Sequence, residues 1–444
     1  ERFVRRVGGR PVRIIDPACG DGRFLRVVRS AVEQLGGTVD AVGVDIDTAT
    51  CSALAREEDW IDVRCTDALA ASWELDAGSF DLVVGNPPFL SQLAADTTRG
   101  GASEHGGGPY ADAAAEFLAL GVRLVRPDGG RLAYVLPQSI LAARDAQAVR
   151  ADIDARARLL WSTWTGERDF EAHVVTCALA FEFDAAPTGG DRALGSWSHV
   201  VTSRTGVPPM PKRFEADPAA GRLGDRAWLN ANFRDEYYGM AAAVGDHHSG
   251  PRLVTSGLIA PGRMRWGQRS VRFAKQRFDA PRLDLDALDD KMSAWANKRL
   301  VPKVLVANQT PVVEAVCDPD GDCLPGVPVV AIYPSLAADP APGSIPDVCW
   351  EIAAVLCAPS VSVWAWHRRG GSGLSAGAIR VSPGLLAELA WPAGDLSPAV
   401  TALQAGDVIE AGRLADVAYR HEVSERDACV EWWAPLVSQV LARP

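Results

Sequence analysis

The stretch Asp16-Pro17-Ala18-Cys19-Gly20-Asp21-Gly22-Arg23-Phe24 lies between a short β-branched run and a segment with helical spacing. Residues 11–15 predict a strand, and apolar residues from 24 to 35 recur every three or four positions, which predicts a helix. Gly20 and Gly22 let the backbone turn sharply and approach a ligand without a Cβ in the way. This order predicts an open α/β sheet that binds a ligand at the carboxyl end of its first strand.

The loop lacks both the three-glycine dinucleotide fingerprint and the Gly-Lys-Ser/Thr of a phosphate-binding loop. The loop's two acids, Asp16 and Asp21, would repel phosphates and suit a cationic or hydroxyl-bearing ligand. Residues 41–45 predict a second strand ending in Asp45, at the distance where an acid typically holds a ribose diol. Residues 63–67 predict a third strand ending in Asp67, which is well placed for the exocyclic amine of an adenine ring. Together these acids favour a nucleotide-like cofactor.

A second loop, Asn86-Pro87-Pro88-Phe89, follows a strand predicted over residues 80–85, about seventy residues after the first loop. Carboxyl ends of parallel strands meet at one edge of a sheet, so the second loop should hold the group that reacts with the cofactor. The side-chain oxygen of Asn86 and the carbonyl of Pro87 can accept hydrogen bonds from an amino group. The prolines restrict φ, and Phe89 offers a flat face for a base.

The two loops resemble the S-adenosylmethionine and catalytic motifs of gamma-class adenine-N6-specific DNA methyltransferases of the restriction-modification type. In that family the first motif reads close to Asp-Pro-Ala-Cys-Gly-x-Gly-x-Phe, which residues 16–24 match. The resemblance implies a Rossmann-like methyltransferase sheet with helices on both faces. It also implies methyl transfer from S-adenosylmethionine to N6 of a flipped-out adenine in DNA.

The same resemblance assigns roles to individual residues. It gives catalysis to Asn86, Pro87, Pro88 and Phe89. It gives cofactor binding to Asp16, Ala18, Cys19, Gly20, Gly22, Phe24, Asp45, Ile46, Asp67 and Ala68. Phe170 sits where the family has an aromatic residue that packs on the extruded adenine, although a core position for Phe170 is the alternative.

The rest of the predicted catalytic domain, residues 1–184, follows the order expected after the catalytic motif. We expect helices over residues 111–125 and 142–153, strands over 131–137 and 159–165, and a hairpin arm over 170–181. The glycine-dense stretch at residues 99–109 predicts a loop that closes over the base or is an idle surface loop.

Residues 185–191 read as a linker, and the composition changes after them. Between residues 251 and 310 there are twelve Lys and Arg against five Asp and Glu. Six basic residues fall in one acid-free stretch in which Trp266 and Phe273 are interleaved: Arg263, Arg265, Arg269, Arg272, Lys275 and Arg277. A concentrated basic patch predicts contacts to DNA phosphates, and a solvated basic hairpin is the alternative.

Residues 192–396 are therefore predicted to be a mixed α+β DNA target-recognition domain. Strands over residues 300–333 and an apolar helix over 352–366 resemble the C-terminal region of the same enzymes. Residues 397–444 predict a helical tail.

Composition bounds the remaining properties of the 444-residue chain, which is 48% hydrophobic with a net charge of −11. The negative charge argues against DNA binding by the whole surface, so contact with double-stranded DNA should be local. The nine cysteines show no paired spacing, which predicts a cytoplasmic location and no metal site. The sequence contains no run of eighteen apolar residues, so we expect no membrane-spanning helix. The resemblance leaves room for a cognate restriction endonuclease or specificity partner.

Two alternatives stay open at the level of sequence. The Asn-Pro-Pro-aromatic motif also occurs in enzymes of this fold that methylate RNA or a protein side chain. The family's upstream motif with a Thr-Pro pair does not appear in residues 1–15, so either the sequence is truncated or another segment replaces it. Its absence motivates the second alternative, an inactive relic that binds DNA or a partner.

Overall fold

The computed structural model describes residues 3, 7–70, 72–73, 76–89, 112–167, 174–184, 197–215, 221–232, 234–246, 249–335, 344–373 and 375–443. The chain divides into two compact units, Glu1–Val201 and Thr202–Pro444. The predicted linker at residues 185–191, the glycine-dense loop at 99–109 and Phe170 all lie outside the described residues. The domain limits drawn from the sequence therefore stay predictions.

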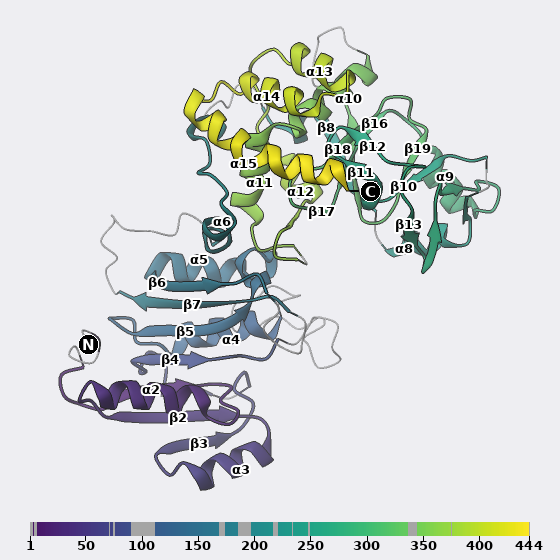
Figure 1. The fold of residues 1–444 in the computed structure, drawn as a ribbon. Coiled ribbons are helices and arrows are strands. Elements are labelled where there is room, and N and C mark those ends of the chain that lie inside the picture. Colours follow the sequence, from purple (N-terminus) through teal and green to yellow (C-terminus); the bar gives the residue numbers. More distant parts are fainter. Residues whose placement is uncertain are drawn as a thin grey trace. The chain divides into compact units, whose positions relative to one another are not determined.

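Unit 1 is built on a seven-stranded sheet with the order β3-β2-β1-β4-β5-β7-β6 (Figure 1). Its strands are β1 (Val12–Asp16), β2 (Val39–Asp45), β3 (Ile61–Cys65), β4 (Leu82–Gly85), β5 (Arg131–Pro137), β6 (Ala157–Trp164) and β7 (Thr176–Phe183). Its principal helices are α2 (Arg23–Gln34), α3 (Thr48–Glu57), α4 (Ala113–Leu124) and α5 (Gln147–Arg156).

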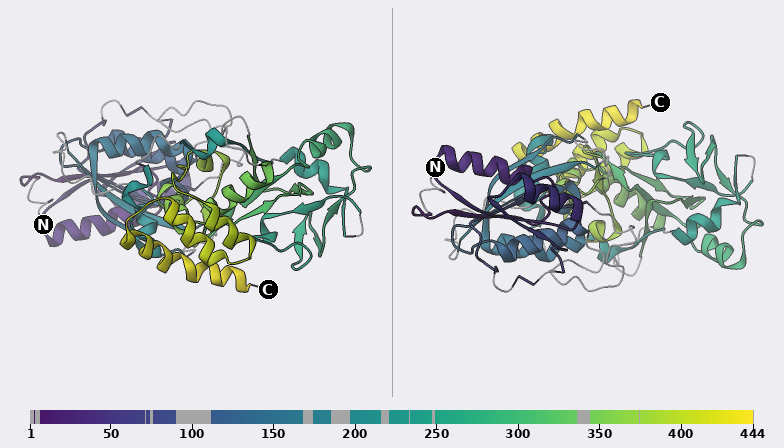
Figure 2. Two further views of the ribbon diagram at one scale, coloured as in Figure 1. Left: turned by 90° about the horizontal axis from the view of Figure 1, so that it is seen from above. Right: turned by 90° about the horizontal axis from the view of Figure 1, so that it is seen from below.

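The strand directions place the two motif loops at one edge of this sheet. Strands β1 to β5 are parallel, and β7 is antiparallel to both β5 and β6. Ile15 pairs with Val83 across β1 and β4, so the loops that follow these two neighbouring strands begin side by side. Figure 2 shows α2 on one face of the sheet and the helices that follow β4 on the other. The predicted Rossmann-like α/β fold is confirmed.

The amino ends of β1 and β4 are tied together by a buried acid. Asp81 accepts two hydrogen bonds of 2.6 Å from the guanidinium of Arg10. It accepts another of 3.0 Å from the backbone N–H of Arg13 in β1. These bonds fix the register of the two strands whose opposite ends carry the motif loops. The apolar residues of β1, β2 and α2 then pack into a common core that includes Ile14, Leu25 and Ala41.

Most predicted elements of unit 1 agree with the structure, with two local differences. Strand β3 ends at Cys65, so Asp67 lies two residues beyond the strand. The helix predicted from residue 142 starts as α5 only at Gln147, because two 3-10 turns, Gln138–Leu141 and Arg144–Ala146, precede it. Neither difference moves the motif loops.

In the described residues of unit 2 there are two four-stranded sheets, ordered β18-β16-β20-β8 and β19-β10-β15-β9, and three two-stranded pairs. The strands are β8 (Ala227–Ala231), β9 (Val244–Gly245), β10 (Arg252–Val254), β11 (Ile259–Ala260), β12 (Arg263–Met264), β13 (Val271–Phe273), β14 (Gln276–Phe278), β15 (Arg282–Leu283), β16 (Lys303–Ala307), β17 (Gln309–Thr310), β18 (Ala315–Asp318), β19 (Cys323–Pro325), β20 (Val329–Pro334) and β21 (Ile379–Arg380). The helices are α7 (Leu223–Arg226), α8 (Arg234–Ala241), α9 (Asp290–Asn297), α10 (Ile345–Leu356), α11 (Pro359–Arg369), α12 (Pro383–Ala387), α13 (Ser397–Gln404), α14 (Val408–Ala418) and α15 (Val423–Ala442), and α6 (His199–Thr205) spans the boundary between the units.

The single apolar helix predicted over residues 352–366 is wrong, because the structure has two helices there. Helix α11 begins at Pro359, whose ring cannot continue α10 but suits the first turn of a new helix. The two helices meet at a bend of 66°. Among the described residues no single helix is long and apolar enough to cross a membrane, and this bent pair reaches that length and composition only when joined.

The segment predicted as a helical tail forms α13, α14 and α15, which pack onto α10 and α11. Figures 1 and 2 show these helices at one end of unit 2 and the strand-rich part at the other. The mixed α+β composition predicted for this half of the chain agrees with the structure.

Candidate active site and nucleic-acid interface

Asp16, at the carboxyl end of β1, is the most deeply buried acid of the motif loops, with 1% of its surface exposed. Its Oδ1 accepts a hydrogen bond of 3.0 Å from the N–H of Ala18. Its Oδ2 is buried and has no hydrogen-bond partner within the described part of the chain. Burial raises the pKa of Asp16 from its ordinary value of 3.8 to about 7. One carboxylate oxygen is thus left without the partner that a buried acceptor normally has.

The glycines of the first loop are required by its geometry. Gly20 and Gly22 have φ values of 51° and 75°, in the left-handed region that favours glycine. A Cβ on Gly22 would also lie 2.7 Å from Cδ1 of Leu54 in α3. Cys19 turns its sulfur into the core, where a Cβ on Gly43 would lie 3.1 Å from it. The loop therefore presents backbone rather than side chains at its turn.

Asp45 links the first loop to the end of β2. Its Oδ2 accepts a hydrogen bond of 2.9 Å from the N–H of Gly20, and its Oδ1 accepts one of 2.9 Å from the N–H of Asp47. Beside it, Ile46 is 70% exposed and Phe24 is 38% exposed. Exposed apolar side chains around a polar loop are suited to a ligand with a planar apolar part.

The other predicted cofactor residues occupy the loop after β3. Asp67 is exposed and accepts a hydrogen bond of 2.9 Å from the N–H of Leu69. Ala68 is buried, and its carbonyl accepts a hydrogen bond of 2.9 Å from Nε1 of Trp73. Cys65, at the end of β3, pairs with Asp45 in the parallel register and is exposed. The carboxyl ends of β1, β2 and β3 thus bring the predicted cofactor residues to one edge of the sheet.

The Asn-Pro-Pro-Phe loop leaves β4 directly beside Asp16. A Cβ on Gly85, the residue before Asn86, would lie 2.6 Å from Oδ1 of Asp16. The Oδ1 of Asn86 is buried and accepts no hydrogen bond from any described residue. Pro87 is buried, whereas Phe89 is half-buried. Gly85 is thus a further residue of this site, and its position directly before Asn86 is the one sequence signal of the close approach.

Five of the six predicted DNA-binding residues are exposed on unit 2. They are Arg263, Arg269, Arg272, Lys275 and Arg277. The interleaved aromatic residues do not face solvent with them. Phe273 is buried, and Trp266 is half-buried with its Nε1 donating to the carbonyl of Pro281 at 2.8 Å. The exposed face of this stretch is therefore cationic, and its inner face is apolar.

Arg265 is the exception, and its predicted role as a DNA contact is corrected by the structure. It is 6% exposed, and its guanidinium donates to the carbonyls of Val440 and Arg443 at 2.5 and 2.9 Å. The buried Glu314 lies close enough for its charge to act on Arg265, and burial raises the pKa of Glu314 to about 7. Arg265 thus holds the basic stretch against the end of α15.

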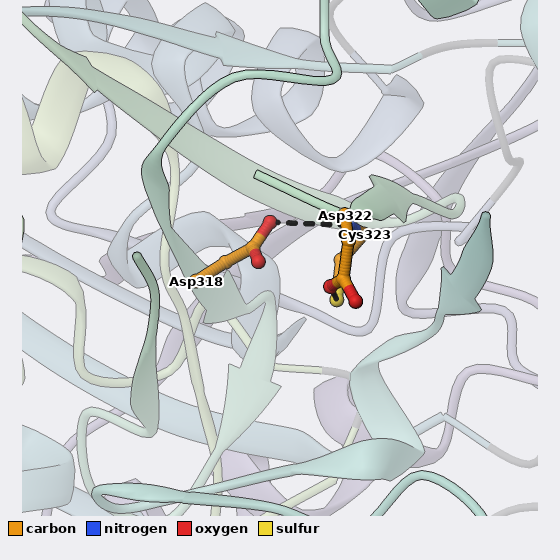
Figure 3. Close-up of side chains that lie close together, drawn as sticks. All are labelled: Asp318, Asp322 and Cys323. Carbon is orange, nitrogen blue, oxygen red and sulfur yellow. Dashed lines mark hydrogen bonds between the residues drawn. The ribbon is translucent and has the colours of Figure 1, made fainter. Parts of the chain in front are cut away.

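One further cluster has side chains that could hold a metal ion. Ligand atoms of Asp318, Asp322 and Cys323 lie within 4.8 Å of one another (Figure 3). However, Asp318 already accepts a bond of 2.5 Å from Nζ of the buried Lys303, and Asp322 pairs with Arg252 at 3.1 Å. These two cations neutralise the carboxylates and would repel a metal ion, so we assign the cluster a structural role.

Part of unit 1 is similar to a known protein family. Residues 44–160 match the model of the Eco57I restriction-modification methylase family. A curated relative, the type II methyltransferase M.TthHB8I of Thermus thermophilus, is 28% identical over 165 residues. That match covers 33% of this chain and 34% of the relative, so the chain spans about a third of its length.

Solved structures show partial likeness as well. The methyltransferase subunit of a type I restriction-modification system from Streptococcus thermophilus is 21% identical, with a TM-score of 0.35 over 42% of each chain. The type IIG restriction endonuclease BpuSI is 13% identical, with a TM-score of 0.38, and the match covers 99% of this chain and 64% of that one.

Proposed function

We propose that the chain methylates N6 of an adenine flipped out of DNA, a proposal supported by the match of residues 44–160 to the restriction-modification methylase family. S-adenosylmethionine supplies the electrophilic methyl group. The observation that carries the proposal is the buried Oδ1 of Asn86, an acceptor at the carboxyl end of β4 without a partner among the described residues. An amino group brought to this position would supply the missing hydrogen bond.

The chemistry of an exocyclic amine explains why such an acceptor is useful. The lone pair of the adenine amino group is delocalised into the ring, which makes the nitrogen a weak nucleophile. Hydrogen bonds donated to Asn86 Oδ1 and to the carbonyl of Pro87 draw the nitrogen toward tetrahedral geometry. The same two acceptors stabilise the positive charge that develops on the nitrogen. Phe89, half-buried at the start of the next segment, offers a face for the flipped base.

The residues at the neighbouring strand ends fit the cofactor. Asp16 keeps a buried oxygen for a cationic group such as an α-ammonium, since its Oδ2 lacks a partner in the described ranges. Asp45 stands at the end of β2, where carboxylates bind ribose hydroxyls. The exposed side chains of Ile46 and Phe24 would cover the apolar parts. We also assign Ala18, Cys19, Gly20, Gly22, Asp67 and Ala68 to this site, with Cys19 contributing through its backbone.

The choice of DNA over a protein substrate rests on unit 2. Five exposed cations are concentrated in one fifteen-residue segment, residues 263–277, although the net charge of the chain is −11. Phosphate contacts supply much of the affinity of proteins for DNA, and such contacts require local positive charge. A protein side chain as substrate would need no such surface.

The proposal is tested by mass spectrometry of methylated products. The purified chain is incubated with S-adenosylmethionine carrying a deuterated methyl group and, in separate reactions, with duplex DNA, RNA or a protein extract. We expect labelled N6-methyladenine in DNA and no label in the other two. Label in RNA or protein instead would replace the substrate, and cofactor binding without product in any reaction would favour a relic.

A further inference from the structure

Strands β13 and β14 form a two-stranded hairpin that, among the described strands, pairs with neither four-stranded sheet; β13 is labelled in Figure 1. Val271 pairs with Phe278, and Arg272 pairs with Arg277. Val271, Phe273 and Phe278 are buried, whereas Arg272 and Arg277 are exposed. The hairpin therefore rests on its apolar face and presents a charged face to solvent.

The turn of this hairpin has an unusual sequence for its geometry. Ala274 and Lys275 have φ values of 47° and 67°, so both central residues of the two-residue turn are left-handed. Such a turn favours Asn-Gly or other glycine-containing pairs, because residues with a Cβ are strained there. Strained positions persist where the surroundings enforce them, and they are common at functional sites. The strain here keeps an exposed ammonium at the tip of the hairpin.

The two arginines are also placed unfavourably for the free protein. Residues directly opposite on an antiparallel pair have close Cβ atoms, and like charges at such positions are destabilising. Within the described part of the chain neither Arg272 nor Arg277 forms an ion pair; Arg277 donates only to the hydroxyl of Ser270, at 3.1 Å. An anion between the two guanidinium groups would turn this repulsion into two charge-assisted bonds.

We propose that the β13–β14 hairpin is a phosphate clamp for DNA. Arg272 and Arg277 bind one phosphodiester between them, and Lys275 at the turn binds an adjacent one. This inference rests on the proposed function, because it names how part of unit 2 would hold the DNA that unit 1 methylates. Arg263 and Arg269 lie outside the hairpin and are not members of the clamp.

The clamp makes two predictions that a merely solvated hairpin does not make. Replacing either arginine with glutamine relieves repulsion, so the free protein should melt at a higher temperature while its affinity for DNA falls. The two arginines also serve the same phosphate. Losing both arginines should therefore reduce the number of neutralised phosphates by one. If the two arginines contacted different phosphates, that number would fall by two.

The test measures binding of a fluorescent thirty-base-pair duplex by full-length protein over a series of KCl concentrations, without cofactor. The variants are Arg272→Gln, Arg277→Gln, the double variant and Lys275→Asn. Ala274→Asn is the matched control for turn strain, because it relieves the same kind of backbone strain and keeps every charge. Lys298→Gln, which removes an exposed cation directly after helix α9, is the control for net charge.

Each neutralised phosphate contributes about 0.9 to the slope of log affinity against log salt. We expect the double arginine variant and Lys275→Asn each to make the salt dependence weaker, with a slope less negative by about 0.9. Both controls should keep the wild-type slope. A loss of about 1.8 in the double variant would overturn the shared clamp, and no loss would remove the hairpin from the interface. If wild-type protein does not bind the duplex, the proposed function fails rather than the clamp alone.

Discussion

Gly85 and Asp16 are in such close approach that a Cβ on Gly85 would lie 2.6 Å from the carboxylate oxygen Oδ1 of Asp16. The carboxylate of Asp16 therefore occupies the position beside Gly85 that a side chain there would need. Any side chain on Gly85 would displace either the acid proposed to face the cofactor or the amide proposed to face the substrate.

Replacing Gly85 with alanine should therefore lower both stability and cofactor affinity. Overpacking of this kind typically costs ~1–3 kcal/mol. Thermal unfolding and calorimetric titration with S-adenosylmethionine measure the two effects. Gly384→Ala is the control, because no atom lies within 4 Å of its Cβ position and it lies in helix α12, where alanine is favoured. A Gly85→Ala variant that matches wild type in both measurements would mean that the loop relaxes freely.

Cofactor affinity should rise with pH through about 7, the value to which burial raises the pKa of Asp16. A carboxylate binds a cationic group and a carboxylic acid does not, so binding at low pH must first remove a proton. Above about pH 7 the acid is already ionised, and the affinity should level off. Titrations between pH 5.5 and 8.5 measure this dependence. In Asp16→Asn the affinity should be lower and the rise through pH 7 absent; a rise that survives would assign it to another group.

Ionisation of Asp16 should favour cofactor binding but lower the stability of the folded protein. Because the pKa of Asp16 is higher in the folded protein than in the unfolded chain, the folded state holds its proton more tightly between pH 3.8 and about 7. Asp16 thus lowers the stability of the free protein as pH rises through that window. Asp16→Asn should flatten this part of the pH–stability curve.

Asn86→Ala should strongly slow methyl transfer while leaving cofactor affinity nearly unchanged. Losing one preorganised hydrogen-bonding group at a developing charge typically costs ~2.7–4 kcal/mol, or a factor of about 100–1000 in turnover. Single-turnover rates and calorimetric cofactor binding separate the two effects. Turnover equal to wild type would remove Asn86 from the reaction.

Asp45→Ala should weaken S-adenosylmethionine by about 1.5–3 kcal/mol, because a charge-assisted bond to a ribose hydroxyl is lost. It should also lower stability, since the carboxylate accepts hydrogen bonds from the N–H groups of Gly20 and Asp47. Asp67→Ala removes another acid assigned to the cofactor, but its carboxylate accepts from Leu69 in its own loop and does not support the glycine-rich loop. Calorimetry on both variants, with melting temperatures, separates binding from loop support. Equal affinities in Asp45→Ala and wild type would place the ribose elsewhere.

Arg265→Gln should lower stability without changing the salt dependence of DNA binding. The guanidinium is buried against the carbonyls of Val440 and Arg443, and leaving buried acceptors unpaired costs about 1–3 kcal/mol. Denaturant unfolding gives the stability change, and the KCl series gives the slope. A slope reduced as in Lys275→Asn would return Arg265 to the DNA contacts.

The fold of unit 1 could be predicted because its signals are local. The β-branched runs before residues 16 and 86, and the helical spacing after residue 22, each specify one element, and the parallel sheet brings the loops together. The extent of β3 could not be read as closely, because the alternating pattern continues past Cys65 toward Asp67 after pairing with β2 has ended.

Other features depend on contacts between distant residues, which a single sequence does not reveal. Arg265 lies in a basic run like its neighbours, and only packing against residues about 175 positions later decides that it is buried. Gly85 looks like any strand-end glycine until Asp16 is placed beside it. The break between α10 and α11 did have a local signal in Pro359, which the continuous apolar character of the segment obscured.

Cys65 gives this edge of the sheet a ready attachment point for a probe. All nine cysteines of the chain lie in described residues, and eight of them are buried. Cys65 alone is exposed, at the strand end that pairs with Asp45. A thiol-reactive fluorophore added to the native protein should therefore modify one position, next to the proposed cofactor site. Ligand binding at that edge could then be followed in real time without first removing the other thiols by mutagenesis.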